Sequence, residues 1–170
     1  MAETQLDVRG LPKPDAYRAL KEQLDALCEG ITDPIAIMAT MACVLHLGFG
    51  HLWTGFYRRI GPTKLVVGPF QGTLGCMEIE FGRGVCGTAA QSRQTVIVPD
   101  VRLFPGHIAC DARSLSEIVV PVFDSRGEVM AVLDIDSANT NTFDDEDRRE
   151  LEGWVTSFAV PGVSGSRADG

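Results

Sequence analysis

A β-hairpin pattern in the last third of the chain constrains the fold more than any other feature. Two apolar, β-branched runs, 116–123 and 128–136, flank Asp124-Ser125-Arg126-Gly127, whose residue types are typical of a turn. Residues 51–60 and 65–67 form another pair of short aromatic or β-branched runs, separated by a Gly-Pro dipeptide. Strands joined by tight turns run antiparallel, so the sequence predicts an antiparallel sheet.

Two helical patterns precede these strands. The apolar residues from Tyr17 to Ile31 recur every three or four positions, which predicts one face of a helix. Asp33-Pro34 is typical of an N-cap followed by a proline in the first turn. The next run, 35–47, is apolar on nearly every side and predicts a buried helix that ends at Gly48.

The remaining segments alternate between short elements and loops. Residues 84–91 favour a short helix and 95–98 a strand, whereas 68–75 and 99–113 have the glycine and proline content of loops. Acidic residues in the first turn of 144–159 favour a last helix. Its apolar face consists of Leu151, Trp154, Val155 and Phe158. The whole order predicts an α+β domain with helices packed on a central sheet.

The composition is that of one folded domain. A chain of 170 residues, 45% hydrophobic and 22% charged, has the size and balance of a single globular domain. We assign that domain to residues 15–159, with a lead-in at 1–14 and a flexible tail at 160–170. The net charge of −8 disfavours nucleic acid or an anionic membrane as a partner. Without an apolar run of about 18 residues or a signal core, we expect a cytoplasmic protein.

The expected cytoplasmic location affects how the five cysteines are interpreted. An odd number of cysteines in a reducing compartment disfavours a structural disulfide framework and leaves reactive, metal-binding or buried thiols. Cys28 and Cys43 lie in helical patterns and are interpreted as core residues. Cys76, Cys86 and Cys110 lie in loop-like or glycine-rich segments, where a functional role and simple burial remain open alternatives.

Cys110 is the best candidate for a nucleophile. The thiolate is the reactive form of cysteine, and His107, Arg83 or Arg113 supplies a favourable positive charge if the fold brings one of them close. The alternative for His107 is a loop histidine that bonds the backbone. A zinc site built from His107 and the three loop cysteines lacks a CxxC pair, so we expect neither a metal nor a cofactor.

Three carboxylates form a second constellation on the predicted hairpin. Asp134 and Asp136 are two residues apart on one strand and therefore share a face. A turn of two or four residues pairs Glu117 directly with Asp134, whereas a three-residue turn places Glu117 on the opposite face unless another bulge compensates. Clustered acids raise one another's pKa, which suits a proton donor or an amine-binding site. Alternatively, all three side chains face solvent.

Trp53 and Tyr57 lie on one face of the first predicted strand, with Gly55 between them. Aromatic side chains in strands are most often part of a core, and that is the simpler interpretation here. The missing side chain of Gly55 leaves open space on the same face, which also suits the wall of a pocket.

Longer motifs resemble one enzyme family from about Tyr17 to Phe158. The motifs are Gly68–Gly72, Cys76, Phe81–Ala90, Val98–Val101, Phe104–Asp111, Ser116–Pro121 and Leu133–Ser137. They resemble the free methionine-(R)-sulfoxide reductases, which are GAF-domain enzymes. Three positions depart from the family pattern: Leu52 stands where asparagine is usual, Gly75 replaces a common alanine and Glu80 a common proline.

The resemblance implies a GAF-like fold, with helices on one side of the sheet and a loop-covered pocket on the other. It implies that Cys110 is the attacking cysteine and that Cys76 and Cys86 are its partner cysteines. The positions that match the substrate pocket are Trp53, Tyr57, Glu117, Asp134 and Asp136, of which Glu117 and Asp136 are also expected to take part in catalysis.

The resemblance also implies a reaction. Free L-methionine (R)-sulfoxide is reduced to methionine, Cys110 passes through a sulfenic acid to a disulfide with Cys76 or Cys86, and thioredoxin restores the thiols. A homodimer is the expectation for the family. The main alternative is a non-catalytic GAF module that binds a small ligand and regulates another protein; a peroxide-reducing thiol protein is a third candidate.

Overall fold

A computed structural model describes residues 7–108 and 110–157 of the chain. Its elements are α1 (Lys13–Leu27), α2 (Pro34–Phe49), β1 (Trp53–Ile60), β2 (Lys64–Gly72), β3 (Glu78–Glu80), α3 (Gly84–Ser92), β4 (Val96–Val98), the 3-10 helix η1 (Val101–Leu103), β5 (Ser116–Phe123), β6 (Val129–Ser137) and α4 (Asp145–Ser157). The strands form one antiparallel sheet in the order β3-β2-β1-β6-β5-β4. The predicted α+β class is confirmed.

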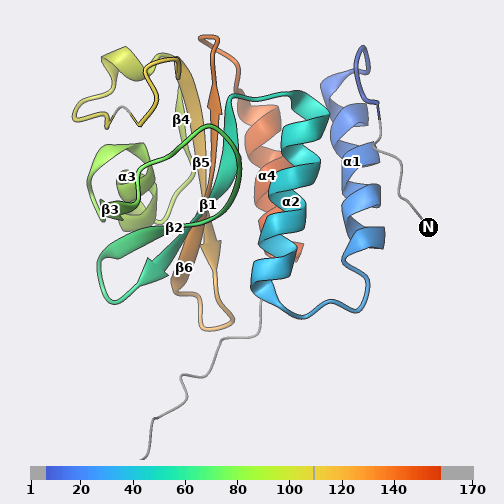
Figure 1. Cartoon of the computed structure of the whole chain (residues 1–170), viewed down its shortest axis with the longest axis horizontal. Coiled ribbons are helices and arrows are strands. Elements are labelled where there is room, and N and C mark those ends of the chain that lie inside the picture. Colours follow the sequence, from blue (N-terminus) through green and yellow to red (C-terminus); the bar gives the residue numbers. More distant parts are fainter. Residues whose placement is uncertain (1–6, 109, 158–170) are drawn as a thin grey trace, which may run out of the picture.

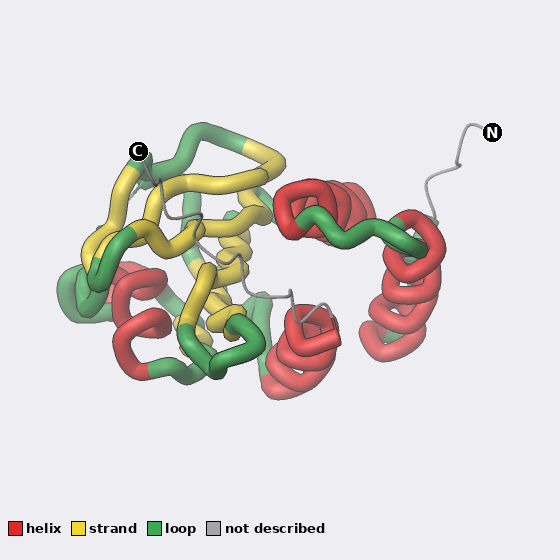
Figure 2. Tube along the Cα trace, turned by 90° about the horizontal axis from the view of Figure 1, so that it is seen from below, coloured by secondary structure: helices red, strands yellow, loops and turns green. Residues whose placement is uncertain are grey.

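Helices cover the two faces of the sheet unequally (Figure 1). On one face, α2 packs on β1 and β2 and α4 packs on β5, while α1 lies against α2 and α4 as an outer layer. Viewed from below, α1 is the helix farthest from the strands (Figure 2). On the other face, α3 contacts β5 and β6. The predicted one-sided helix layer therefore holds for three helices, and α3 is the exception.

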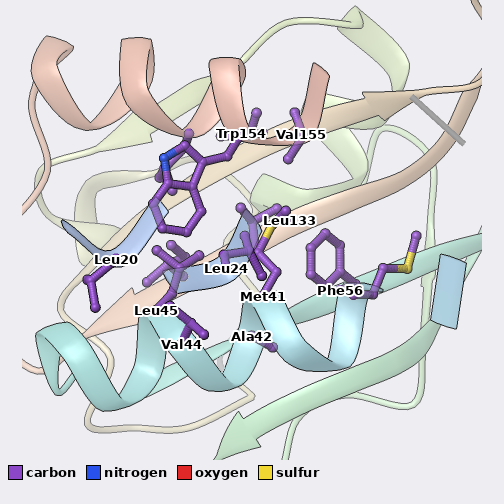
Figure 3. Packing of buried hydrophobic residues seen from close by; sticks show 14 of the residues in the cluster. Leu20, Leu24, Met41, Ala42, Val44, Leu45, Phe56, Leu133, Trp154 and Val155 are labelled. Carbon is purple, nitrogen blue, oxygen red and sulfur yellow. The ribbon is translucent and has the colours of Figure 1, made fainter. Parts of the chain in front are cut away.

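The larger core lies between the three-helix layer and the sheet (Figure 3). Phe56 and Leu133 from the strands meet Met41 and Leu45 of α2, and Trp154 of α4 closes the same cluster. Each of these side chains is almost fully buried. Because burying a large apolar side chain contributes about 1.5–3 kcal/mol, this layer fixes the sheet whose other face carries the polar residues.

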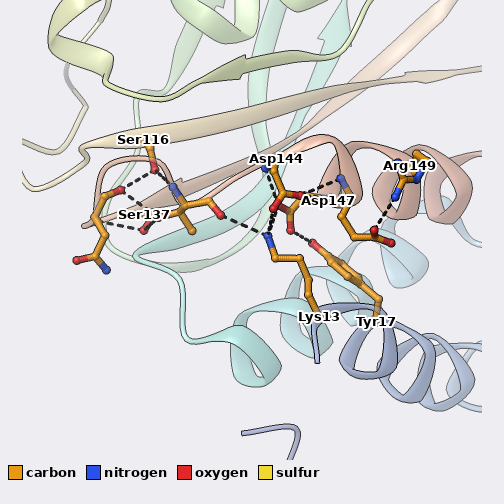
Figure 4. A network of polar contacts seen from close by, with 10 residues as sticks. Lys13, Tyr17, Ser116, Ser137, Asp144, Asp147 and Arg149 are labelled. Carbon is orange, nitrogen blue, oxygen red and sulfur yellow. Dashed lines mark hydrogen bonds and ion pairs between the residues drawn. The ribbon is translucent and has the colours of Figure 1, made fainter. Parts of the chain in front are cut away.

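A buried polar network joins α1 to α4 (Figure 4). The Tyr17 hydroxyl donates to one oxygen of the Asp147 carboxylate at 2.8 Å, and the Lys13 ammonium donates to the other at 2.7 Å. The backbone N–H of Asp144 also donates to Asp147, at 2.8 Å. Asp147 is buried, so these three bonds compensate a charge that is costly to bury alone.

Two predicted helix boundaries are wrong at their C-terminal ends. The first helix ends at Leu27, and Ile31 is 45% exposed outside it. The second helix begins as predicted, because the Asp33 side chain accepts from the N–H of Ile35 at 2.9 Å. It continues beyond Gly48 to Phe49, because the next residue, Gly50, adopts the left-handed conformation with φ of 68° that ends helices.

The strand β2 is longer than predicted: it includes residues 68–72, for which the sequence predicts a loop. Gly55 pairs with Phe70 and Tyr57 pairs with Val67, so Gly68-Pro69 occupies an irregularity in the ladder. Proline has no N–H to donate and is tolerated at such a bulge. The glycine and proline therefore mark a bulge within a strand.

The ends of the domain are described in part. The first helix begins at Lys13, two residues before the predicted start of the domain. Phe158 and the predicted tail at 160–170 lie outside the described residues, so the limits 15–159 stay a prediction. Among the described helices, none has both the length and the apolar character needed to cross a membrane.

Candidate active site

The predicted site residues gather in one pocket, on the face of the sheet opposite the three-helix layer. The pocket lies between β1, β5 and β6, the first turn of α3, and loop residues 73–75, 107–108 and 110–114, and it encloses about 40 Å³. Seven of the eight predicted site residues line it: Trp53, Tyr57, Cys86, Cys110, Glu117, Asp134 and Asp136. The eighth, Cys76, is bonded to Cys110.

The hairpin register brings the three carboxylates to one face. Glu117 pairs directly with Asp136, and the pairing with Asp134 that a turn of two or four residues would give does not occur. Five residues, 124–128, separate the paired positions at the turn, and the ladder shifts by one residue at Met130. This bulge compensates the odd loop length and keeps Glu117 on the same face as the two aspartates.

Burial and mutual repulsion shift these carboxyl groups towards their protonated forms. Burial raises the pKa of Glu117 well above its usual value, and the neighbouring Asp134 and Asp136 raise it further. Burial also raises the pKa of Asp134, whose Oδ1 has no hydrogen-bond partner among the described residues. The pKa of Asp136 rises to about 6 through burial, although the Ser114 hydroxyl donates to it at 2.5 Å. The pocket floor therefore combines two carboxyl groups shifted towards the neutral form, Glu117 and Asp134, with Asp136, whose pKa is about 6.

Cys76 and Cys110 form a disulfide at the edge of this pocket. They are 34 residues apart in sequence, and their Cα atoms lie 5.3 Å apart. Cys110 is exposed and Cys76 is half-buried, so an external thiol has access to the bond. The sequence left Cys76 and Cys86 as equal partners for Cys110, and the structure joins Cys110 to Cys76.

Cys86 is a free thiol on the pocket floor. It lies in the first turn of α3 and is 4% exposed. Its thiol donates to Oε1 of Glu117, with sulfur and oxygen 3.9 Å apart. Burial raises the pKa of Cys86 well above its usual value, and the nearby Asp134 and Glu117 raise it further. Cys86 is therefore a neutral hydrogen-bond donor at pH 7 and a poor nucleophile.

The cationic neighbours proposed for Cys110 are only partly assembled. His107 and Arg83 line the pocket with Cys110, whereas Arg113 pairs with Asp111 at 2.8 Å. Burial lowers the pKa of His107, which leaves its imidazole neutral at pH 7. Arg83 is thus the charged basic group among the described residues of the pocket lining.

Trp53 and Tyr57 line the pocket with stacked rings, and Phe70, which is not a lining residue, stacks on Trp53. The ring centroids of Trp53 lie 5.5 Å from Tyr57 and 5.4 Å from Phe70. The open space expected at Gly55 does not exist, because a Cβ atom there would lie 2.8 Å from the Cα of Phe70. Gly55 is instead required by the close approach of Phe70. The indole Nε1 of Trp53 is buried without a hydrogen-bond partner among the described residues.

Sequence reasoning missed Ser114, which lines the pocket, and Phe70, which packs on the lining residue Trp53. Phe70 was missed because its segment was interpreted as loop, and pairing it with Gly55 required the strand to extend. Ser114 was missed because a single serine in an irregular segment carries no pattern. Its hydroxyl bond to Asp136 depends on a loop that returns to the start of β5.

Comparison with known proteins identifies the family to which the chain belongs. A model of the GAF domain family matches residues 18–160. The free methionine-R-sulfoxide reductase of Escherichia coli is 43% identical over 147 residues, which cover 86% of this chain and 88% of the relative. The chain belongs to the free methionine-R-sulfoxide reductase family of GAF domains. The family resemblance noted in the sequence is confirmed.

Solved structures of free methionine-R-sulfoxide reductases share the fold over most of their length. The enzyme from Neisseria meningitidis, in complex with its substrate, has a TM-score of 0.85 and 39% identity over 92% of this chain and 94% of that chain. The Staphylococcus aureus fRMsr, also in complex with its substrate, has a TM-score of 0.77 and 45% identity over 82% of this chain and 91% of that chain.

Proposed function

We propose that this protein reduces free L-methionine (R)-sulfoxide to L-methionine through Cys110. The observation that carries the proposal is a disulfide, Cys76–Cys110, beside a pocket floored by three carboxylates. A thiol pair supplies the two electrons that the sulfoxide must receive. The carboxylates offer both a proton donor and a counter-ion for an ammonium group. The names of the Escherichia coli relative and the Neisseria meningitidis complex support the same substrate.

Binding would divide the carboxylates into two roles. Protonated Glu117 donates a hydrogen bond to the sulfoxide oxygen, which makes the sulfur more electrophilic. Ionised Asp136, together with Asp134, holds the substrate ammonium. A peptide-bonded methionine lacks that charge, so this role restricts the enzyme to the free amino acid. Trp53 packs on the methyl-sulfur end of the substrate, a contact of about 0.3–1.5 kcal/mol.

The chemical steps use two thiols and release one water molecule. The Cys110 thiolate attacks the sulfoxide sulfur, the oxygen transfers with a proton to Cys110, and methionine leaves while Cys110 becomes a sulfenic acid. The Cys76 thiol then displaces water from that sulfenic acid and forms the disulfide. A thioredoxin dithiol reduces this bond by exchange and becomes oxidised itself.

The structure with the Cys76–Cys110 disulfide corresponds to the step of the proposed cycle that follows methionine release. Its cavity of about 40 Å³ has room for a few water molecules only. We expect substrate to enter after reduction separates Cys76 from Cys110 and allows the pocket between them to widen. Recycling by thioredoxin also favours action in the cytoplasm, where such a reductant keeps thiols reduced.

Turnover assays with defined substrates test the proposal. With thioredoxin, thioredoxin reductase and NADPH, we expect consumption of free methionine (R)-sulfoxide, little consumption of the S epimer, and loss of activity on the N-acetylated R epimer. The N-acetyl compound keeps the sulfoxide and removes the ammonium. Reduction of the S epimer alone, or of hydrogen peroxide in preference to either epimer, would contradict the proposal. A non-catalytic module would turn over none of them.

Replacing Cys76 with serine separates the oxidative and reductive halves of the cycle. The variant keeps Cys110, so we expect one methionine per protein in a single turnover and a trapped sulfenic acid. Thioredoxin-dependent cycling should fall at least about tenfold, because no intramolecular disulfide forms. Mass spectrometry of the oxidised protein and steady-state NADPH consumption measure the two effects. Cys28→Ser, which changes a buried thiol in the helical layer, is the matched control. Undiminished cycling in Cys76→Ser would assign the resolving role to another thiol.

A further inference from the structure

The pocket floor places the free thiol of Cys86 beside two carboxylates, and the proposed reduction makes no use of this thiol. We propose that Cys86, Glu117 and Asp134 form a site for one divalent cation of borderline softness, of the Zn²⁺ type. We further infer that this ion competes with the substrate ammonium. The competition rests on the proposed function, whereas the binding of the ion does not.

The three ligand atoms already lie close together. The sulfur of Cys86 and one carboxylate oxygen each from Glu117 and Asp134 all lie within 4.8 Å of one another. Cys86 Sγ and Glu117 Oε1 are 3.9 Å apart. In a tetrahedral zinc site, bonds of about 2.3 Å to sulfur and 2.0 Å to oxygen separate those two atoms by roughly 3.5 Å. Side-chain adjustments that shorten separations of at most 4.8 Å would close the site.

A buried oxygen without a partner points to a ligand at this place. Asp134 is 4% exposed, and its Oδ1 accepts no hydrogen bond from the described residues. An isolated acceptor in that environment costs free energy, which a bound cation recovers. Among the described residues, neither Glu117 nor Asp134 forms an ion pair with a lysine or arginine. His107 Nε2 lies 3.8 Å from the other Glu117 oxygen, where it can orient that carboxylate from outside the ligand set.

The ligand types select the ion. A thiolate among the ligands favours Zn²⁺ over Mg²⁺ or Ca²⁺, which prefer oxygen. On binding, the Cys86 thiol releases its proton to solvent and a zinc–sulfur bond forms, with no change of oxidation state. The ligands come from α3, β5 and β6, three packed elements, so little ordering is needed. All three ligand residues line the pocket, from which a water molecule would supply the fourth ligand.

The test uses the oxidised protein, in which the Cys76–Cys110 bond removes those two thiols as competing ligands. Isothermal titration with zinc chloride should give one ion per chain. Co²⁺ should produce a near-ultraviolet sulfur-to-cobalt charge-transfer band, which requires a thiolate ligand. We expect Cys86→Ser to abolish the band and to weaken zinc binding by more than the about 10–100-fold that loss of an outer partner costs. Asp134→Asn should weaken zinc binding while the band remains at high Co²⁺.

Controls separate this site from other thiols and from the enzymatic reaction. Cys28→Ser should bind zinc as the parent does, and circular dichroism checks that each variant is folded. No zinc binding, or binding unchanged in a folded Cys86→Ser variant, would overturn the site even if the enzyme turns over sulfoxide in zinc-free buffer. Cys86-dependent zinc binding by an inactive protein would support the site and contradict the proposed function.

Competition is measured where the pocket is open. In the double variant Cys76→Ser and Cys110→Ser, neither redox thiol remains and the disulfide cannot form. Millimolar L-methionine should weaken the apparent zinc affinity severalfold in this protein. Zinc affinity that does not respond to methionine, although methionine itself binds, would overturn the inferred competition.

Discussion

Replacing Cys110 with serine is expected to lower the turnover of free methionine (R)-sulfoxide by at least about 10³-fold, the scale of losing an activated nucleophile. A serine hydroxyl has no accessible anionic form at neutral pH and attacks sulfur poorly. Cys110 lines the pocket, is exposed, and is the residue whose sulfur is oxidised to the disulfide with Cys76. Single-turnover formation of methionine, measured without any reductant, isolates the attack from the recycling steps.

The rival nucleophile in the same pocket is Cys86. Its burial among carboxyl groups raises its pKa, so it remains a neutral thiol and lacks the reactive form. If a folded Cys110→Ser variant still produced methionine in a single turnover, Cys110 would not be the attacking cysteine. A dimedone adduct on Cys86 in that variant would identify it as the nucleophile. Cys28→Ser, with its substitution in the helical core, should match the parent in the same assay.

The carboxylate site shows how far sequence patterns reach. Period-two alternation placed Asp134 and Asp136 on one face, and the hairpin pattern placed Glu117 near them. Their exact pairing depended on the five-residue turn and on a bulge at Met130, and neither leaves a clear mark in the sequence. The odd-length turn and the bulge each shift the register by one residue, and the combined shift of two residues restores the face of Glu117 but moves its partner from Asp134 to Asp136. The shared face of Asp134 and Asp136 was therefore predictable, whereas the face and the partner of Glu117 were not.

The Cys76–Cys110 pairing could not be predicted from local sequence patterns, for a different physical reason. Cys76 follows β2 and Cys110 precedes β5, and these two strands are separated in the sheet by β1 and β6, so the contact between the cysteines depends on how two irregular segments cross the pocket. No periodicity within either segment encodes that contact. Cys86 was equally eligible from its glycine-rich surroundings, but the helix α3 carries it to the acidic floor of the pocket instead.

Asp136→Asn is expected to weaken methionine binding by about 30-fold or more at pH 7.5, because truncating one partner of a buried charge pair costs about 2–5 kcal/mol. Methionine, the product, carries the same ammonium as the substrate. Cys110→Ser is the parent protein for this measurement, since it keeps the pocket open and removes the titration of the nucleophile. The fluorescence of Trp53 in the pocket wall reports binding, and Asp145→Asn on the exposed surface of α4 is the matched control.

The pKa of Asp136 predicts the direction in which methionine affinity changes with pH. Burial raises the pKa of Asp136 to about 6, so the carboxylate that pairs with the ammonium is lost as the pH falls below 6. Methionine affinity should therefore rise up to tenfold per pH unit between pH 5 and 6 and level off above pH 7. Asp136→Asn should abolish this dependence. An unchanged dependence in Asp136→Asn would show that another group carries it.

The free energy of unfolding should change with pH in the opposite direction to methionine affinity. Unfolding therefore does not explain a loss of methionine binding in Asp136→Asn. The folded state holds the proton of Asp136 more tightly than the unfolded chain, where its pKa is about 4. The free energy of unfolding therefore falls as the pH rises from about 4 to about 6, and remains lower above that range. Asparagine carries no charge and escapes this penalty, so Asp136→Asn should unfold at the same or a higher urea concentration than its parent at pH 7.5. A variant that binds methionine poorly and resists urea well would mark Asp136 as a residue kept for binding at the expense of stability.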